Sequence, residues 1–200
     1  MPQPMNIILA STSRYRRALL ERLRFDFRCV APDVDETPVA GELPLDLATR
    51  LSRAKAREVA NRFPAAMVIG SDQVASIDGR TAIGKPGSFE AARAQLRASS
   101  GTAVTFYTGV ALNCAARGME RFHVELFSVQ FRELSDRQIE SYLRREQPYD
   151  CAGSFKAEGL GIALFEKMVG DDPSSLEGLP LIRLNQMLLR EGLDALVPGT

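Results

Sequence analysis

The chain brings hydroxyl and guanidinium groups together at the end of its first apolar run. Residues 5–10 read MNIILA and residues 11–17 read STSRYRR. A helix beginning here would direct free backbone N–H groups and the positive end of its dipole to one place, and Arg16 and Arg17 would add paired donors that match phosphate oxygens. A capped surface helix with solvated arginines is the alternative. Because positive charge in the first turn opposes the helix dipole, a bound anion explains the arginines better than helix stability does.

Two acidic residues occupy positions from which they could act on such an anion. Asp72 directly follows the apolar run AAMVIGS at 65–71, and strand ends are where α/β proteins build their sites. A carboxylate there could bind a metal ion or position water for attack. Glu36, in a polar loop, could also reach a metal ion. A turn-forming Asp72 and a solvated Glu36 are the alternatives that these short stretches leave open.

One lysine lies in a segment that resembles a phosphate loop only superficially. Residues 79–85 read GRTAIGK, but Pro86 stands where a Ser or Thr would have to hold magnesium. Lys85 could still contact phosphate as an isolated cation. The single histidine, His123, argues against a Ser-His-Asp triad. An anion cradle with carboxylates and no nucleophile–base pair is best suited to metal-assisted attack of water on a phosphoanhydride.

Alternating strands and helices must position these residues. The apolar pattern predicts strands near 5–10, 27–32, 65–72, 102–115 and 119–134, and helices near 14–24, 46–62, 88–99, 135–146 and 179–193. Early alternation followed by a hairpin favours an α/β or α+β fold with a mixed sheet. We expect a single domain over residues 1–200, and a composition shift near Gly101 allows two lobes within it.

Composition excludes several classes of protein. The chain has 25 basic and 25 acidic residues and zero formal net charge, whereas nucleic-acid-binding domains usually show a basic excess. No apolar stretch approaches the roughly 20 residues that span a bilayer. The three separated cysteines indicate reduced thiols rather than a disulfide framework. We therefore expect a cytoplasmic protein with no membrane association and no stable nucleic-acid partner.

Short blocks along nearly the whole chain resemble the Maf-like nucleoside triphosphate pyrophosphatases. The blocks are ILASTSRYRRALLERL, VDET, GSDQV, GKP, TFYTG, CAGSFKAEGLG and GLPLIRL. GSDQV and CAGSFKAEG are similar to the subgroup that acts on 7-methyl-GTP, whereas the subgroup specific for dTTP and UTP carries Asp-Thr in place of Asp72-Gln73. The chain departs from the pattern at Arg14, where the signature usually has proline, and at Tyr15, where this subgroup can carry tryptophan.

The resemblance implies hydrolysis of a nucleoside triphosphate between its α and β phosphates, releasing a monophosphate and pyrophosphate. It also implies a divalent metal ion, Mg²⁺ or Mn²⁺, often a homodimer, and an α/β fold with a mixed, elongated sheet flanked by helices. Asp72 would accept a proton from water or only orient it. The other implied roles are phosphate binding by Ser11, Arg16, Arg17, Lys55 and Lys85, metal binding by Glu36 with Asp72, and base specificity by Tyr15, Gln73 and Glu158.

The chemistry of the base supports the 7-methyl-GTP subgroup. N7-methylation gives guanine a positive charge, and an aromatic face such as Tyr15 attracts a flat cation by roughly 0.5–2 kcal/mol. Glu158 could accept hydrogen bonds from the N1–H and the exocyclic amine of guanine. A pyrimidine offers neither the cation nor this pair of donors.

Three other functions remain open at this point. The first is a nucleotide-binding regulator of cell division, an inhibitor of septum formation that binds without turnover. The second is a pyrophosphatase for other modified purine triphosphates. The third is a module that binds single-stranded RNA, against which zero net charge and few aromatic residues argue.

Overall fold

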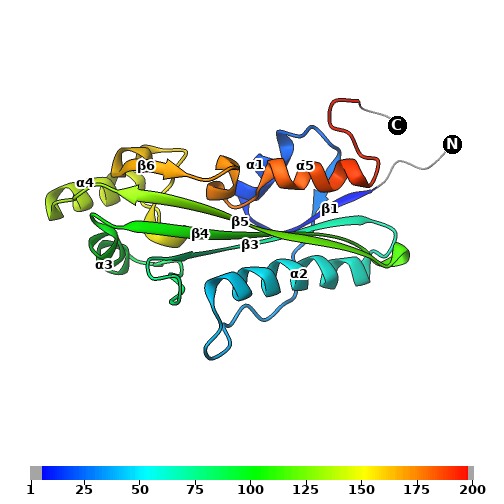
Figure 1. The fold of residues 1–200 in the computed structure, drawn as a ribbon, viewed down its shortest axis with the longest axis horizontal. Helices are drawn as coiled ribbons and strands as arrows, with labels where there is room; N and C mark the ends of the chain where they lie inside the picture. Colours follow the sequence, from blue (N-terminus) through cyan, green and yellow to red (C-terminus); the bar gives the residue numbers. More distant parts are fainter. Residues whose placement is uncertain (1–5, 198–200) are drawn as a thin grey trace.

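The computed structural model describes residues 6–197 and contains one mixed sheet of six strands in the order β2-β1-β3-β4-β5-β6 (Figure 1). β1 pairs in parallel with β2 and β3, and the remaining neighbours are antiparallel. Met5, which we expected in the first strand, lies outside the described residues. The strands are β1 (Ile7–Ala10), β2 (Phe27–Cys29), β3 (Met67–Ser76), β4 (Ala103–Cys114), β5 (Met119–Phe131) and β6 (Phe165–Val169).

Five α-helices flank this sheet: α1 (Arg14–Glu21), α2 (Pro44–Arg62), α3 (Phe89–Ser99), α4 (Asp136–Glu146) and α5 (Leu181–Arg190). Short 3₁₀ turns, among them η2 (Ala152–Ser154), η3 (Leu160–Leu164) and η4 (Pro173–Glu177), connect the later elements. These bounds agree with the predicted elements to within a few residues, and β6 is a strand that the sequence analysis does not predict. The predicted α/β class with a mixed, elongated sheet is confirmed.

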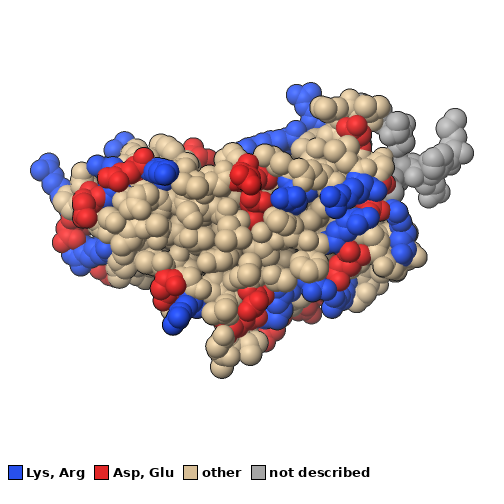
Figure 2. Space-filling view, viewed as in Figure 1, with Lys and Arg blue, Asp and Glu red and all other residues tan. Residues whose placement is uncertain are grey.

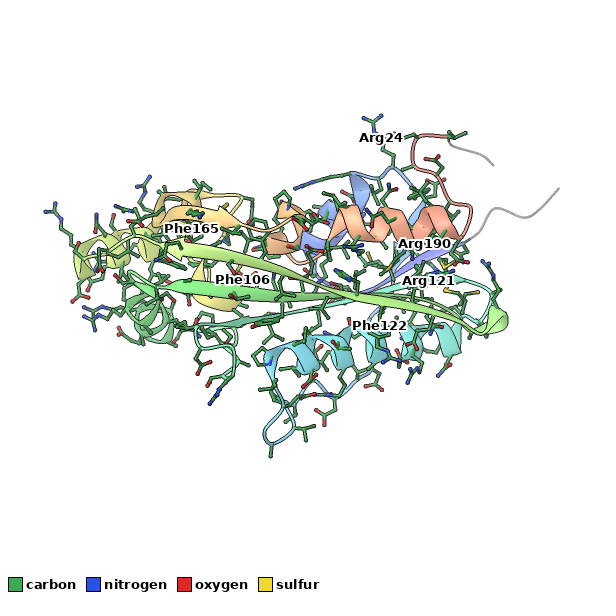
Figure 3. The ribbon with its side chains drawn as sticks, in the orientation of Figure 1. Arg24, Phe106, Arg121, Phe122, Phe165 and Arg190 are labelled. Atoms are coloured by element: carbon green, nitrogen blue, oxygen red, sulfur yellow. The ribbon has the colours of Figure 1, made fainter. Side chains whose placement is uncertain are left out.

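The long strands β3, β4 and β5 run the length of the molecule and connect two lobes (Figure 1). One core packs α1 and α5 against the sheet in the first lobe, a second packs α3 and α4 in the second lobe, and two smaller clusters pack α2 against the strands. Phe106 and Phe165 lie in the second lobe, whereas Arg121 and Arg190 lie in the first (Figure 3). β4 contributes to both cores, so the two lobes share one continuous sheet.

Asp72 lies inside its strand, not at its end, so this part of the sequence prediction is wrong. β3 continues to Ser76, and Asp72 pairs with Gly109 of β4. The strand that ends here is the neighbouring β1, whose last residue, Ala10, pairs with Gly70 of β3. Beyond this point β3 has no parallel neighbour, and the open edge exposes Asp72 to a cleft. The polar residues at 71–73 interrupt the apolar pattern although the strand continues: Asp72 and Gln73 line the cavities, and Ser71 donates to the carbonyls of Gly109 and Gly178.

Two glycines allow α2 to lie close against the strands. A β-carbon at Gly70 would collide with the carbonyl of Ser52, and one at Gly109 would collide with the carbonyl of Ala48. Gly70 lies on β3 and Gly109 on β4, directly beneath the helix. Because neither glycine has a side chain, α2 packs closely enough for Lys55 to reach Asp72.

Charge on the surface is mixed in sign. In the view of Figure 2, basic and acidic side chains are intermixed towards both ends of the molecule, and the area between these ends is largely uncharged. This distribution agrees with the zero formal net charge of the chain. Among the helices that the structure describes, none combines the length and hydrophobicity needed to cross a membrane.

Candidate active site

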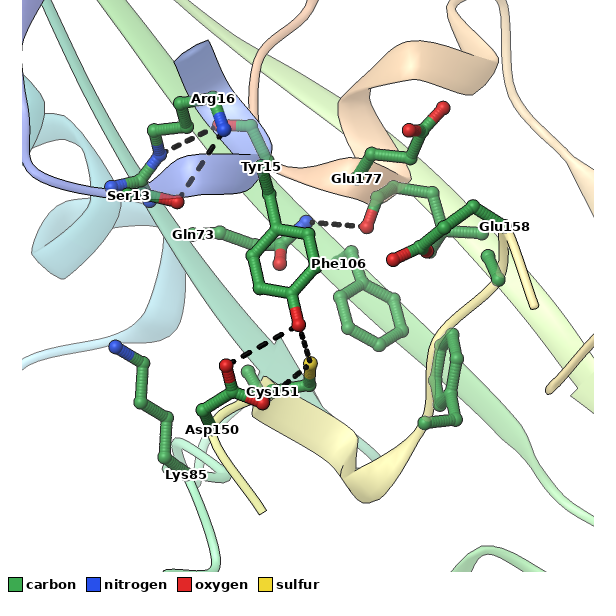
Figure 4. Close-up of a pocket in the computed structure, with 15 residues that line it drawn as sticks. Ser13, Tyr15, Arg16, Gln73, Lys85, Phe106, Asp150, Cys151, Glu158 and Glu177 are labelled. Carbon is green, nitrogen blue, oxygen red and sulfur yellow. Dashed lines mark hydrogen bonds between the residues drawn. The ribbon is translucent and has the colours of Figure 1, made fainter. Parts of the chain in front are cut away.

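Two connected cavities meet at the N-terminus of α1. The larger, of about 760 Å³, follows the open edge of β3 and is lined by Ser11, Glu36, Lys55 and Asp72 among others. The smaller, of about 110 Å³, is lined by Phe106, Cys151, Phe155 and Glu158 among others (Figure 4). The residues that line both are Ser13, Tyr15, Arg16, Gln73, Lys85, Asp150 and Ala152.

A buried lysine joins two carboxylates in the larger cavity. Lys55 Nζ lies 2.7 Å from Asp72 Oδ1 and 2.8 Å from Glu36 Oε1. Lys55 and Asp72 are only 4% and 7% exposed, whereas the Glu36 side chain lies on an exposed loop. No hydrogen bond to Asp72 Oδ2 is found among the described residues. This oxygen is therefore available to a ligand or a water molecule.

The larger cavity carries an excess of positive charge. Its charged lining residues are the cations Arg14, Arg16, Lys55 and Lys85 and the acids Glu36, Asp72 and Asp150. Burial by itself would raise the pKa of Glu36, but the hydrogen bond and charge of Lys55 and the charges of Arg16 and Lys85 lower it below its ordinary value. Three cations from separate segments, Lys55, Arg16 and Lys85, thus act on the Glu36 carboxylate. Such a cluster of cations is what a ligand with several negative charges would need.

The N-terminus of α1 supplies the polar wall between the cavities. Ser13 caps the helix by accepting from the Arg16 N–H, and Ser11 Oγ accepts from the Ser13 N–H. The Arg16 Nε donates to the Gly178 carbonyl at 2.9 Å, which fixes its side chain. Within the described part of the chain, neither Arg16 nor Lys85 forms an ion pair within 4 Å. Both are free to bind an anion.

Arg17 does not reach the site, although the family signature implies a phosphate role for it. Its Nε lies 3.0 Å from Glu21 Oε1, and the side chain is exposed and lines neither cavity. Neighbouring residues on an α-helix are about 100° apart around its axis. Tyr15 and Arg16 face the cleft, and the further turn of about 100° places Arg17 on the exposed side of α1, beside Glu21.

The three residues implied in base specificity come together around the smaller cavity. Tyr15, Gln73 and Glu158 all line it (Figure 4). Gln73 Nε2 donates to the carbonyls of Ser175 and Leu176 at 2.8 and 3.1 Å. Because carbonyls only accept, these contacts fix the amide orientation and leave Gln73 Oε1 as an acceptor. Glu158 is exposed, and no hydrogen bond to its carboxylate is found among the described residues.

Aromatic packing positions the segment that carries Glu158. The Phe155 ring makes edge-to-face contacts with Phe106, Phe131 and Phe165 at centroid distances of 5.3, 5.7 and 4.8 Å. Such pairs stabilise beyond the area that they bury. Gly153, with φ of 75°, lets the chain turn tightly beside Phe106. The segment is therefore anchored in the core of the second lobe while Glu158 faces the cavity.

Several lining residues were not identified from the sequence. Asp150 contacts Tyr15 across 135 positions, and no spacing rule connects the two. Cys151 and Glu177 also line the smaller cavity. The only signal in the sequence was the CAGSFKAEG block, which begins at Cys151 and which Asp150 directly precedes.

The carboxylates fit a divalent metal ion that is shared with a phosphate ligand. Among residues 6–197 no group of three or more His, Cys, Asp or Glu side chains is arranged to hold a metal ion. Mg²⁺, however, usually binds through one or two carboxylates together with substrate phosphates and water. Asp72 and Glu36, held by one ammonium group, provide such a pair.

Comparisons with known proteins identify the family and the fold of this chain. The model of the family described as Maf-like protein matches residues 6–191. A 7-methyl-GTP pyrophosphatase from Nitrosococcus oceani is 52% identical over 195 residues, covering 98% of each chain. The structure of the Staphylococcus aureus Ham1 protein superimposes with a TM-score of 0.54 at 15% identity, covering 94% of this chain and 99% of that one, which shows a shared fold. The match over nearly its whole length shows that this chain belongs to the Maf-like protein family.

Proposed function

We propose that this protein hydrolyses 7-methyl-GTP to 7-methyl-GMP and pyrophosphate. The observation that carries the proposal is the junction of the two cavities at Tyr15 and Gln73. A base beside Glu158 would direct its phosphates toward Arg16, Lys55 and Asp72. The relative that bears the name 7-methyl-GTP pyrophosphatase supports the same substrate.

In the proposed reaction, water attacks the α-phosphorus and the bond from this phosphorus to the bridging oxygen of the β-phosphate breaks. The oxygen and one proton of the water stay on the monophosphate, and Asp72 Oδ2 accepts the other proton. Lys55 holds Asp72 through Oδ1, so the carboxylate has a fixed direction toward the cavity. Arg16, Lys55 and Lys85 stabilise the charge that develops on the leaving pyrophosphate.

We further propose that Asp72 and Glu36 bind Mg²⁺ or Mn²⁺ together with the triphosphate. When bound, the metal ion would neutralise negative charge on the phosphate oxygens. Of these two carboxylates, Glu36 lies on an exposed loop and Asp72 lies within strand β3. Activity measured with EDTA, Mg²⁺ and Mn²⁺ tests this proposal, and full turnover in EDTA would contradict it.

The base cavity is proposed to select an N7-methylated guanine. The Tyr15 ring provides a π face for the cationic ring. The free carboxylate of Glu158 and Gln73 Oε1 provide acceptors for the N1–H and the exocyclic amine. Since the Gln73 amide nitrogen donates to the carbonyls of Ser175 and Leu176 in η4, Gln73 would contact the base as an acceptor, through Oε1.

A panel of nucleoside triphosphates with pyrophosphate as the readout tests the substrate. The proposal predicts the highest kcat/KM for 7-methyl-GTP and much lower values for GTP, dTTP and UTP. A higher value for another modified purine triphosphate would move the assignment to that nucleotide. Tight binding without release of pyrophosphate would instead favour a regulator of cell division.

We also propose that the protein acts in the cytoplasm and forms a homodimer. All three cysteines are unpaired, which suits a reducing compartment. The homodimer is implied by the family resemblance, and light scattering coupled to size-exclusion chromatography tests it. A monomeric mass at micromolar concentration would contradict it.

A further inference from the structure

A carboxylate outside the expected specificity residues lies next to the aromatic ring of the base cavity. Tyr15 Oη lies 3.3 Å from Asp150 Oδ2, and the Cys151 thiol lies 3.5 Å from Asp150 Oδ1 (Figure 4). Asp150 lines both cavities, as Tyr15 does. The contact joins α1 to the segment before η2, so Asp150 belongs to the wall of the site and not to a remote surface.

Arg14 completes this cluster from the solvent side. Its Nη2 donates to Tyr15 Oη at 2.8 Å and lies 3.4 Å from Asp150 Oδ2. Its guanidinium carbon is 4.8 Å from the centroid of the Tyr15 ring. The Arg14 side chain is 73% exposed and that of Asp150 is 52% exposed. Arg14 and Asp150 thus hold the same hydroxyl but carry opposite charges.

Asp150 carries a negative charge at neutral pH. Burial would raise the pKa of Asp150, but hydrogen bonds from Cys151 and Tyr15 and the charge of Arg14 lower it below its ordinary value. Burial raises the pKa of Tyr15 to about 12, so its hydroxyl stays protonated and donates to the carboxylate. The anion therefore remains beside the neutral ring on which a base would stack.

We propose that Asp150 is a further specificity-determining residue, whose carboxylate favours a cationic purine ring over a neutral one, and that Arg14 opposes this preference. The inference rests on the proposed function, since it concerns how the same site recognises its base. Asp150 and Glu158 would provide negative charge near the base from two separate segments. The positive ring of an N7-methylguanine would be attracted by both, whereas neutral guanine would not.

Opposite charge changes separate this electrostatic role from mere support of Tyr15. If Asp150 and Arg14 only positioned the Tyr15 hydroxyl, then losing either would weaken recognition in the same direction. If their charges act on the base, Asp150→Asn must lower the preference for a cationic ring and Arg14→Gln must raise it. Asn matches Asp in size and can still accept from Tyr15, and Gln is shorter than Arg but keeps a neutral amide donor, so both substitutions remove the charge and retain a hydrogen-bonding group.

The experiment compares kcat/KM for 7-methyl-GTP and GTP at constant ionic strength in the wild type and both variants. We expect Asp150→Asn to lower the ratio of the two values by roughly threefold to tenfold, as a partly solvated charge can. Arg14→Gln should raise this ratio. Asp150→Glu keeps the negative charge and should therefore give a ratio close to that of the wild type. Glu21→Gln is the matched control, because it removes an acidic charge from α1 outside both cavities.

An unchanged ratio in Asp150→Asn, or a shift in the same direction in both variants, would overturn the inference. Failure of the wild type to turn over 7-methyl-GTP would overturn the proposed function instead. In that case calorimetric affinities for 7-methyl-GMP and GMP measure the same preference without turnover. An affinity ratio unaffected by Asp150→Asn would then reject the role of Asp150 on its own.

Discussion

Lys55 Nζ and Asp72 Oδ1 lie 2.7 Å apart, and both side chains are buried at the point where β1 ends and β3 continues. This ion pair links helix α2 to strand β3 of the sheet. It directs Asp72 into the cleft, and the same ammonium group also holds Glu36, which lies on the exposed loop between β2 and α2. The proposed catalytic carboxylate is therefore oriented by a cation that also lines the larger cavity, where the proposal places the phosphates.

Asp72→Asn should leave the protein folded and remove most of its activity. The amide oxygen can still accept from Lys55, but it cannot take a proton from water. Loss of a general base typically reduces kcat by about 10²- to 10⁴-fold. Pyrophosphate release under saturating substrate measures the effect, and thermal unfolding checks the fold. Near-normal turnover by a folded variant would remove Asp72 from the proposed role.

Lys55→Met should destabilise the protein, because it leaves the buried Asp72 carboxylate without its cation. Breaking a buried ion pair from one side costs about 3 kcal/mol or more. Adding Asp72→Asn should recover part of this loss, since the second change removes the uncompensated charge. Urea unfolding at pH 7 measures all four proteins. Lys85→Met changes an exposed lysine and is the control, which should alter the free energy of unfolding by less than about 0.5 kcal/mol. If the effects of Lys55→Met and Asp72→Asn on this free energy simply add in the double variant, the two residues are not coupled.

Arg16→Ala and Lys85→Ala should raise KM for 7-methyl-GTP and GTP by similar factors. Their charges address the phosphates, which the two nucleotides share. Hydrogen bonds to charged groups contribute about 1.5–3 kcal/mol, so the increase for the better ordered Arg16 should be roughly tenfold or more. Arg17→Ala should leave KM close to the wild-type value, because this side chain faces solvent. A changed base preference in either cleft variant would contradict the assignment to phosphate.

Glu158→Gln should reduce the preference for 7-methyl-GTP over GTP, since the negative charge is lost while the shape is kept. Losing one partner of a buried hydrogen bond costs roughly 1–3 kcal/mol, which sets an upper range of tenfold to hundredfold for this exposed residue. The ratio of the two kcat/KM values measures the effect. The same ratio in wild type and variant would exclude Glu158 from the base site.

Cys151 should react slowly with iodoacetamide near neutral pH. Burial, followed by the charge of Asp150, raises the pKa of its thiol to about 11. Below this pH the thiol is protonated, so the alkylation rate should increase about tenfold per pH unit from pH 7 to pH 10. Mass spectrometry of the labelled peptides follows Cys151, with the exposed Cys29 as a reference and the buried Cys114 as a negative control. A rate that is already maximal at pH 7 would contradict the raised pKa.

The sequence by itself determined most of the secondary structure and the outline of the site. Apolar periodicity identified the helices because each buries one stripe against the sheet, and the polar block at 11–17 contains residues that line the larger cavity. The short blocks that run in order from ILASTSRYRRALLERL to GLPLIRL were sufficient to identify the family. These signals are local, since each depends on residues that are neighbours in the chain.

Only the tertiary structure decided which side chains face one another. Asp72 resembled the end of a strand, but antiparallel pairing with β4 extends β3 beyond it, and the early end of β1 creates the cleft. Arg16 and Arg17 are equivalent in the sequence, whereas the rotation of α1 turns one inward and the other outward. The contact between Tyr15 and Asp150 spans 135 positions and depends on how the second lobe packs against α1. Long-range packing sets such contacts, and no local pattern encodes them.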